Sequence, residues 1–494
     1  MCINNALSRQ KMNKNGSLYY LGVGIVLVGI AELFLMLFAF LMGDQRTAYA
    51  FAGAVVLSIF CGSTLVLATK GEYEPLGRLD SILLLVYFWM IIPIFAAVPF
   101  YSYLGSFIKA YIEAVSALTT TGVTVIQYER YIPKTLFLWR NILAWSGGLL
   151  TITMVILILA PFGIGGLQDK SSKFLGTEFK KMGNFSRILT MVGGAYSLIT
   201  VILVVALMFG GARALDALNI ILSTISTTGY NQHSIGFSYY DSPYTAFIIM
   251  LSMFVGAALI IVFFRQFISA KTRLNFNVEV KIFIIICIFF ALAVTIYKYF
   301  SQQIDVLSAA EYYFYALFDA VSILSTTALI YNTDWQPINF YYFLALVGGA
   351  SFTTAGGMKL FRLLIFLKHT NIEVNQLAFP HSVTSNRFLD MRLDNKFMRL
   401  IWSFFMAYMM LIVILSVVIA SYGYDLNTSL LNAIGAVANI GPFADFMLAK
   451  GQDVYPFSQF DTSLQMWLSG GMILGRLEVI SVLGLLNFAY WKNR

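Results

Sequence analysis

Charged residues are scarce in this 494-residue chain. Asp, Glu, Lys and Arg make up 11% of it, whereas soluble domains carry about 25%. Hydrophobic residues reach 59%, and they occur in runs of about 20 residues or more, long enough to cross a hydrocarbon core of about 30 Å as helices. The composition therefore excludes a water-soluble fold and predicts an all-α integral membrane protein.

Cysteine and histidine are equally rare, with three of each. Cys2, Cys61 and Cys287 lie far apart and form no pair at metal-ligand spacing, so we interpret them as packing thiols. His369 and Glu373 form a helical pair beside a basic stretch, where exposure to water is a better interpretation than a metal site. Zinc binding and acid–base catalysis have little support, so we expect no enzyme and no cofactor held by this chain.

The formal charge of +8 comes from basic residues that sit mainly between apolar runs, which favours membrane topology over nucleic-acid binding. Counted from an inside N-terminus, alternate crossings place the basic clusters at 170–181, 265–273 and 387–399 on one side. This pattern predicts that both termini are cytoplasmic. The ten predicted crossings are residues 18–42, 48–69, 80–104, 136–162, 188–210, 243–264, 280–299, 339–367, 398–421 and 464–491.

Four shorter apolar segments lie between these crossings and suit re-entrant helices. They cover residues 107–121, 213–228, 310–327 and 428–440. Their ends, at 113–122, 220–229, 319–328 and 432–441, superimpose without gaps. A small residue recurs six places before each end, as Ser116, Ser223, Ser322 and Gly435. A repeat at a spacing of about one hundred residues follows, with four copies of helix, re-entrant helix, helix.

The Thr-Thr-Gly ends suggest cation chemistry. Irregular backbone at membrane depth is tolerated where it lines water, and glycine permits angles that aim successive carbonyls inward. Rings of carbonyls can replace the hydration shell of a cation, and threonine hydroxyls add oxygen or brace the loop. The C-terminal ends of the helices favour cations, while Glu113 and Asp319 are expected near the positive N-terminal ends.

Six motifs together resemble the Trk/Ktr/HKT superfamily of potassium and sodium transporters, most closely its bacterial Trk membrane subunit. They are residues 113–122, Trp139-Arg140, 223–229, 348–362, 439–442 and 475–478. The resemblance covers nearly the whole chain. It implies one ion pore formed by four pseudo-symmetric repeats, with two extra N-terminal transmembrane helices. It also implies a homodimer in the cytoplasmic (inner) membrane and a separate cytosolic regulatory protein that binds a nucleotide, ATP/ADP or NAD.

This architecture divides the chain into five parts. The N-terminal tail and the two extra helices take residues 1–79, and the four pore repeats take 80–170, 171–275, 276–385 and 386–494. The resemblance implies that potassium binds in a selectivity filter made of four residues from each repeat. These are Thr120, Thr121, Gly122 and Val123; Thr227, Thr228, Gly229 and Tyr230; Thr326, Thr327, Ala328 and Leu329; and Asn439, Ile440, Gly441 and Pro442. Ala328 stands where the family pattern has glycine, and we expect weaker potassium-over-sodium discrimination for that reason.

Two glycine pairs, Gly348-Gly349 and Gly356-Gly357, enclose a small polar stretch that we expect to break its helix into a loop. It resembles the intramembrane gate of the family. The residues assigned to gating are Gly349, Gly356, Gly357, Lys359 and Arg476, with Glu478 as a partner for Arg476. For Arg140 and Arg362, anchoring of helix ends by snorkelling is at least as good an interpretation as a direct ion role.

The function predicted is uptake of potassium through a carbonyl-lined filter, gated by the loop and by the cytosolic partner. Three alternatives stay open. One is a sodium or poorly selective cation transporter of the same fold. The second is an alternating-access symporter, to which broken helices also point. The third, a membrane-embedded enzyme, is disfavoured because no cluster of His, Cys and acidic residues occurs within the apolar runs.

Overall fold

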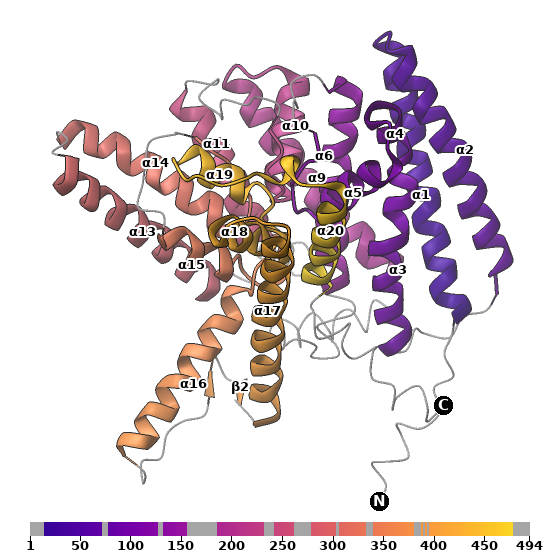
Figure 1. Cartoon of the computed structure of the whole chain (residues 1–494). Coiled ribbons are helices and arrows are strands. Elements are labelled where there is room, and N and C mark those ends of the chain that lie inside the picture. The colour runs from indigo at the N-terminus through magenta and orange to yellow at the C-terminus, as the bar shows by residue number, and fades with distance from the viewer. Residues whose placement is uncertain are drawn as a thin grey trace, which may run out of the picture.

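The computed structural model describes residues 14–71, 78–126, 132–155, 185–231, 242–260, 278–302, 306–331, 339–379, 387–388, 391–392 and 395–477. Within these ranges the chain is helical apart from turns, loops and one antiparallel hairpin, in which β1 (Arg387–Phe388) pairs with β2 (Met391–Arg392) (Figure 1). The basic clusters at 170–181 and 265–273 lie outside these ranges, so the side of each terminus stays a prediction.

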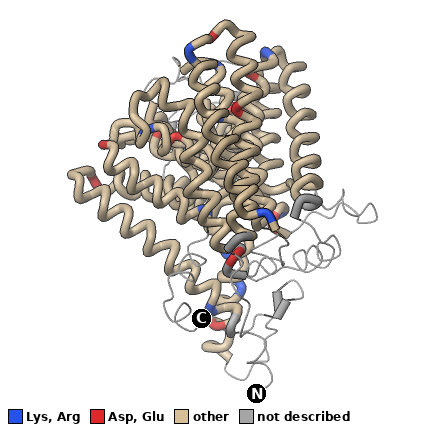
Figure 2. The backbone as a smooth tube through the Cα atoms, turned by 90° about the vertical axis from the view of Figure 1, so that its right-hand side faces the viewer, with Lys and Arg blue, Asp and Glu red and all other residues tan. Residues whose placement is uncertain are grey.

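Five helices are long and apolar enough to cross a membrane: α1 (Lys14–Leu41), α2 (Gln45–Ala68), α9 (Phe185–Phe209), α13 (Val278–Gln302) and α17 (Asn395–Ser421). Their apolar stretches of 21 to 26 residues span about 30 Å or more. Large side chains such as Phe34, Phe209 and Phe289 are exposed on them, as lipid-facing surface requires. In Figure 2 most of the tube is tan, and charged residues are sparse along it. The chain is a multi-pass membrane protein.

The predicted crossing at 80–104 is bent. Its two parts, α3 (Arg78–Ala96) and α4 (Val98–Leu104), meet at an angle of 49°. Pro99, in the first turn of α4, has no N–H with which to continue the hydrogen-bond ladder from Phe95, so the helix breaks there. If this pair is one span, the described residues contain six crossings of the ten that the sequence predicted.

The other four predicted crossings are only partly described or are interrupted. Three of them begin as α6 (Lys134–Met154), α11 (Pro243–Phe254) and α20 (Thr462–Arg476), and their predicted ends lie outside the described residues. A π-helix, η5 (Val255–Leu259), continues α11. The fourth, at 339–367, divides into α15 (Asn339–Val347) and α16 (Leu360–Ala378), so the break predicted from its glycine pairs is present. In Figure 1, α16 and the lower part of α17 project from the rest of the bundle.

The two N-terminal helices pack closely along each other (Figure 1). A methyl group on Gly62 of α2 would lie only 2.8 Å from Val26 Cγ2 of α1, and such small residues allow membrane helices to approach. Glu32 is buried in this contact and accepts a hydrogen bond of 2.8 Å from the Ser58 hydroxyl. Glu32 therefore faces protein and not lipid.

Four short buried helices correspond to the four predicted re-entrant segments. They are α5 (Phe107–Leu118), α10 (Ala214–Ile225), α14 (Val306–Leu324) and α18 (Leu426–Val437). The third is longer than expected because it begins at Val306 instead of residue 310. The carboxylate of Asp425 caps α18 by accepting the N–H groups of Asn427 and Thr428. The Thr428 hydroxyl and these backbone bonds lower the pKa of Asp425. After α18 come α19 (Phe443–Ala449) and the 3-10 turn η6 (Phe457–Gln459).

Glycines let three of the following helices touch the ends of these short helices. A methyl group on Gly147 of α6 would lie 1.8 Å from the carbonyl oxygen of Leu118. Gly256 of η5 would meet Ile225 O at 2.3 Å, and Gly475 of α20 would meet Val437 O at 2.2 Å. Each of these three carbonyls belongs to the last residue of a short helix. The same glycine contact therefore recurs in three of the segments.

We expect Gly147→Ala to lower the melting temperature of the detergent-purified protein. The new methyl group would overlap the Leu118 carbonyl, and overpacking of this kind costs typically about 1–3 kcal/mol. Gly194→Ala in α9 is the matched control, because a methyl group there meets nothing within 4 Å. Alanine also favours a helix over glycine by about 1 kcal/mol, so this control should melt no lower than the native protein. Equal melting temperatures for the two variants would contradict the close approach of α6 to α5.

Candidate functional site

The short helices α5, α10, α14 and α18 each end in a turn with the same unusual backbone. We call residues 120–123, 227–230, 326–329 and 439–442 the four turns. The first residue of each has a positive φ: 53° at Thr120, 59° at Thr227, 65° at Thr326 and 52° at Asn439. A left-handed conformation costs a non-glycine residue about 1–2 kcal/mol and is especially rare for β-branched residues. Such strain at four equivalent positions persists only where the surroundings hold it in place.

Serine hydroxyls fix the far end of three of the turns. Ser116, Ser223 and Ser322 donate to the carbonyl oxygens of Val123, Tyr230 and Leu329 at 2.6, 3.0 and 2.9 Å. The backbone carbonyls of the same serines also accept the N–H groups of Thr121, Thr228 and Thr327, each at 2.9 Å. These are the small residues that recur in the sequence repeat. The fourth repeat has Gly435 at this position and therefore no hydroxyl.

Each turn lies directly against the next one. A methyl group on Gly122 would lie 1.8 Å from Thr228 O, and one on Gly229 would lie 1.9 Å from Thr327 O. Gly441 of the fourth turn lies against the first turn, because a methyl group there would lie 2.6 Å from Thr121 O. Turn one thus contacts turn two, turn two contacts turn three, and turn four contacts turn one. The structure brings together the four sets of residues that the sequence proposed.

Ala328 adopts the backbone conformation of the glycines that it replaces. Its φ is +52°, beside +92° at Gly122 and +83° at Gly229. The third turn therefore bends as the first two do, although alanine carries a Cβ and pays the cost of the left-handed region. Both Ala328 and Leu329 are buried.

Hydroxyl groups brace the turns and leave one oxygen without a protein partner. Pairs of hydroxyls bond at 2.7 to 2.8 Å in the first three turns. The pairs are Thr119 with Thr121, Ser226 with Thr228, and Ser325 with Thr327. In contrast, Thr120 Oγ1 is buried and has no hydrogen bond from any residue that the structure describes. A buried hydroxyl oxygen without a protein partner is available to coordinate a cation.

A buried ion pair holds the backbone that leaves the first turn. Arg140 Nη1 lies 3.0 Å from Glu113 Oε1, and the same carboxylate accepts the Thr124 hydroxyl at 3.1 Å and the Val125 N–H at 3.0 Å. The Arg140 guanidinium also lies 4.0 Å from the ring centroid of Tyr230 in the second turn. Arg140 thus links two turns and is fully buried, so the interpretation of a snorkelling anchor was wrong.

A second buried pair joins Asp319 of α14 to Lys450, at 2.6 Å. The sequence placed Glu113 and Asp319 near the N-terminal ends of their helices, and this was wrong. Glu113 is the seventh of twelve residues in α5, and Asp319 lies five residues before the end of α14. Their charges are balanced by buried cations instead of by helix dipoles. Lys450 was missed, because a lysine 131 positions away gives no local signal.

The loop at 348–359, between α15 and α16, packs against the turns. The N–H of Gly356 donates to Thr326 Oγ1 at 2.9 Å, and the N–H of Gly357 donates to Ala438 O at 2.9 Å. A methyl group on Gly356 would lie 1.9 Å from Ala438 O. Gly357 and Lys359 have positive φ, of 76° and 77°. Glycine at 356 is therefore required by the contact, and glycine at 357 suits the backbone.

Carbonyls of the π-helix η5 anchor the other side of this loop. The N–H groups of Ala350 and Thr354 donate to Ala257 O at 2.9 Å and to Gly256 O at 3.4 Å. A π-helix leaves carbonyls out of the ordinary helical ladder, so they are free to accept such bonds. A Cβ on Gly349 would also meet Ala355 Cβ, at 2.5 Å. The loop is thus held by backbone contacts on both sides.

Two cations hold the loop through its carbonyl oxygens. Lys359 Nζ bonds to Ala355 O and lies 3.5 Å from Thr353 O. Arg476 Nη2 donates to Thr354 O at 2.7 Å, and its Nε donates to Thr151 Oγ1 of α6 at 2.9 Å. All five residues assigned to gating therefore meet at this loop. Glu478, the expected partner of Arg476, lies outside the described residues.

Arg362, in the first turn of α16, also lies inside the protein. Its side chain donates to Met358 O at 3.1 Å and lies 3.8 Å from the ring centroid of Phe404, so it does not snorkel either.

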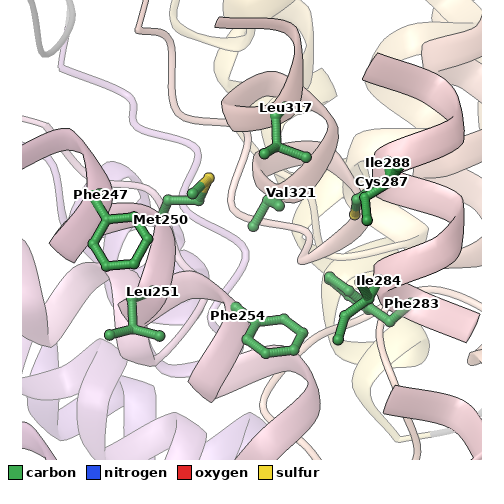
Figure 3. A pocket seen from close by; sticks show the side chains of 10 residues that line it. All are labelled: Phe247, Met250, Leu251, Phe254, Phe283, Ile284, Cys287, Ile288, Leu317 and Val321. Atoms are coloured by element: carbon green, nitrogen blue, oxygen red, sulfur yellow. The ribbon is translucent and has the colours of Figure 1, made fainter. Parts of the chain in front are cut away.

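An apolar pocket of about 220 Å³ opens between α11, α13 and α14 and is lined by apolar side chains such as Phe254 and by Cys287 (Figure 3). It offers no oxygen ligands, so it is unsuited to a hard cation.

The comparisons with known proteins agree with this geometry. A family model described as TrkH, a cation transport protein, matches residues 47–489. The Trk system potassium uptake protein TrkG of Escherichia coli K12 is 28% identical over 467 residues, which cover 91% of this chain and 93% of that protein. The Trk system potassium uptake protein TrkH of Vibrio parahaemolyticus is 27% identical over 489 residues, which cover 96% and 98%.

The fold is similar to a solved structure as well. The crystal structure of the potassium transporter TrkH from Vibrio parahaemolyticus matches with a TM-score of 0.86 and 25% identity, over 97% of this chain and all of that one. The matched family model and the similar fold both extend over nearly the whole chain, including the four turns and the loop. The chain therefore belongs to the TrkH family of cation transport proteins, as its motifs predicted.

Proposed function

We propose that this chain takes up potassium across the cytoplasmic membrane through an opening that the four turns surround. The observation that carries the proposal is the set of close contacts that joins four strained turns of the same form, turn one to two, two to three and four to one. Carbonyls held in such a ring can replace the hydration shell of a monovalent cation. The relatives are named as potassium uptake proteins, which supports potassium as the ion.

Electrostatics favours a cation at this place. The four short helices all end at the turns, and the C-terminal end of a helix carries a partial negative charge. The two buried acidic residues of the short helices are already paired, Glu113 with Arg140 and Asp319 with Lys450. Attraction of the ion thus depends on backbone dipoles and hydroxyl oxygens, which suits an ion that must also leave quickly.

We propose five units for this architecture. Residues 80–170, 171–275, 276–385 and 386–494 are four pseudo-symmetric pore repeats, and residues 1–79 hold the two extra helices. The equivalent φ values in the turns and the recurring glycine contacts support the repeats. We further propose a homodimer in the inner membrane, with both termini cytoplasmic, and a cytosolic nucleotide-binding regulatory protein as partner.

The loop at 348–359 is proposed as the gate. Its residues bond directly to Thr326 Oγ1 and Ala438 O, next to the turns, so a movement of the loop alters the path beneath them. Lys359 and Arg476 bond to carbonyl oxygens of the loop, those of Ala355 and Thr354. Positive charge beside the pathway opposes cation flow.

Ion flux through liposomes tests the function. The native protein should conduct potassium, and Gly229→Ala should abolish most of the flux, because the methyl group would overlap Thr327 O. Gly105→Ala is the matched control: Gly105 also has a positive φ, of 65°, but a methyl group there meets nothing within 4 Å. Both variants pay the left-handed cost of about 1–2 kcal/mol, and only the first disturbs the ring. Native protein that carries neither potassium nor sodium would refute the function.

A poorly selective or sodium-conducting transporter is a second candidate, favoured by Ala328. We expect native protein to discriminate weakly between potassium and sodium, and Ala328→Gly to raise the permeability ratio, because glycine relieves the strain at φ +52°. Bi-ionic potentials on both proteins in the same bilayer measure the ratio. A strongly potassium-selective native protein that Ala328→Gly leaves unchanged would remove Ala328 from the determinants of selectivity.

Release of the loop should raise flux. We expect Arg476→Gln and Lys359→Ala each to increase potassium flux in liposomes without the partner, because each loses a bond to a loop carbonyl and a positive charge. Arg46→Gln is the control, since Arg46 also donates to a backbone carbonyl, Ser102 O at 2.9 Å, but at an exposed site. Correctly folded variants whose flux equals that of the control would rule out the gate.

A further inference from the structure

The peptide group between Ile440 and Gly441, in the fourth turn, points the opposite way from its counterparts. In the first three turns the equivalent N–H, at Gly122, Gly229 and Ala328, points back to the serine carbonyl of its own segment, at 3.4, 3.5 and 3.1 Å. The N–H of Gly441 instead donates across to Thr121 O in the first turn, at 2.7 Å. The fourth turn thus presents a donor where the others present none.

The carbonyl of this peptide has turned correspondingly. Ile440 O lies 2.9 Å from the position that a Cβ on Gly435 would occupy, so it points back toward its own helix. In the other turns the equivalent oxygens of Thr228 and Thr327 lie against the neighbouring glycine. Gly441 also lacks the positive φ that Gly122, Gly229 and Ala328 share. The direction of the Gly441 N–H, the position of Ile440 O and the φ of Gly441 all indicate that this peptide is reversed.

The methyl group of Ala328 accounts for the reversal. The glycines of the first two turns each lie against the carbonyl of the second residue of the next turn. Extended to the third turn by the repeat, this rule sets residue 328 against the carbonyl of residue 440. At Gly122 and Gly229 a methyl group would lie 1.8 to 1.9 Å from the facing carbonyl oxygen. Ala328 has that methyl group and the same left-handed backbone, so the Ile440 carbonyl cannot take the position that its counterparts take.

Gly435 supplies the space into which this carbonyl turns. The other three segments have serine at the equivalent position, and a Cβ only 2.9 Å from Ile440 O is closer than real Cβ atoms come to an oxygen. A side chain at 435 would therefore disfavour the reversed peptide. The two departures from the repeat, alanine at 328 and glycine at 435, act on one carbonyl.

We propose that Ala328 and Gly435 together determine ion specificity by holding the Ile440–Gly441 peptide reversed; this rests on the proposed function. The ring level formed by Thr121 O, Thr228 O and Thr327 O then receives no carbonyl from the fourth turn. Thr121 O is already engaged by the Gly441 N–H. A cation at this level meets fewer carbonyl oxygens and a nearby donor, which weakens the replacement of the larger hydration shell and the preference for potassium over sodium.

The test uses the full-length protein in liposomes with four variants: Ala328→Gly, Gly435→Ser, the double variant, and Gly470→Ser as control. Gly470 lies in α20, where a methyl group meets nothing within 4 Å. Ala328→Gly alone removes the obstacle but leaves the space at 435, so its gain in the potassium/sodium permeability ratio should be partial. The double variant should exceed the product of the single effects by a factor of roughly three or more, as contacting residues couple. The control should leave the ratio unchanged.

A second measurement does not depend on flux. The rise in melting temperature on replacing sodium chloride by potassium chloride, at constant ionic strength, reports potassium binding to the folded protein. It should be larger for the double variant than for the native protein. Where the serine variant is not monodisperse, Ala328→Gly with Gly435→Ala replaces it, since it places the same Cβ beside Ile440 O and favours the helix.

The outcomes separate the two proposals. Native protein that conducts neither ion refutes the proposed function, and the inference falls with it. Native protein that conducts, together with double variants whose permeability ratio and potassium-specific melting shift equal the native values, overturns the inference and leaves the function standing. Simple additivity of the two substitutions also overturns it, because the argument requires both residues to act on the same carbonyl.

Discussion

The close approach of backbone to backbone around the four turns is the constraint on which the rest of the site depends. A single methyl group added to the glycine Cα of one turn would overlap a carbonyl oxygen of the next turn. Such contact requires glycine at this position, or an alanine under strain. It also holds the positive φ of the residue that begins each turn. The serine bonds, the hydroxyl pairs and the glycines of α6, η5 and α20 each hold one side of this arrangement.

The buried cations of this region bond to two kinds of acceptor, carboxylates and backbone carbonyls. Arg140 and Lys450 are paired with carboxylates, and breaking such a buried pair is strongly unfavourable because it leaves an uncompensated charge. The loop cations Lys359 and Arg476 also bond to carbonyl oxygens of the loop. A carbonyl bond is exchanged for water at lower cost than a buried ion pair is broken, which supports the proposal that the loop moves while the turns stay fixed.

The sequence predicted the elements well because periodicity and internal repetition are local signals. Three of the four short helices begin within two residues of their predicted starts, and the broken helix was anticipated from two glycine pairs. Partners distant along the chain were not predictable. The carboxylates of Glu113 and Asp319 were placed near helix N-terminal ends, although their true partners lie 27 and 131 residues away. The π-helix that anchors the loop was also missed, since nothing in residues 255–259 distinguishes it from an ordinary apolar helix.

Internal repetition carries more information once the repeats are arranged in space. Along the sequence, Ala328 and Gly435 are two separate exceptions, one in the third segment and one in the fourth. The contacts between the turns, extended by the repeat, set residue 328 against the Ile440 carbonyl, and Gly435 lies on the other side of that carbonyl. An added methyl group on one side and a missing side chain on the other favour the same orientation of one peptide. With Ala328 but a side chain at residue 435, the carbonyl would be obstructed on both sides. With Gly435 but glycine at residue 328, nothing would hold the carbonyl away from the ring. Together the two exceptions give it a single stable position away from the ring.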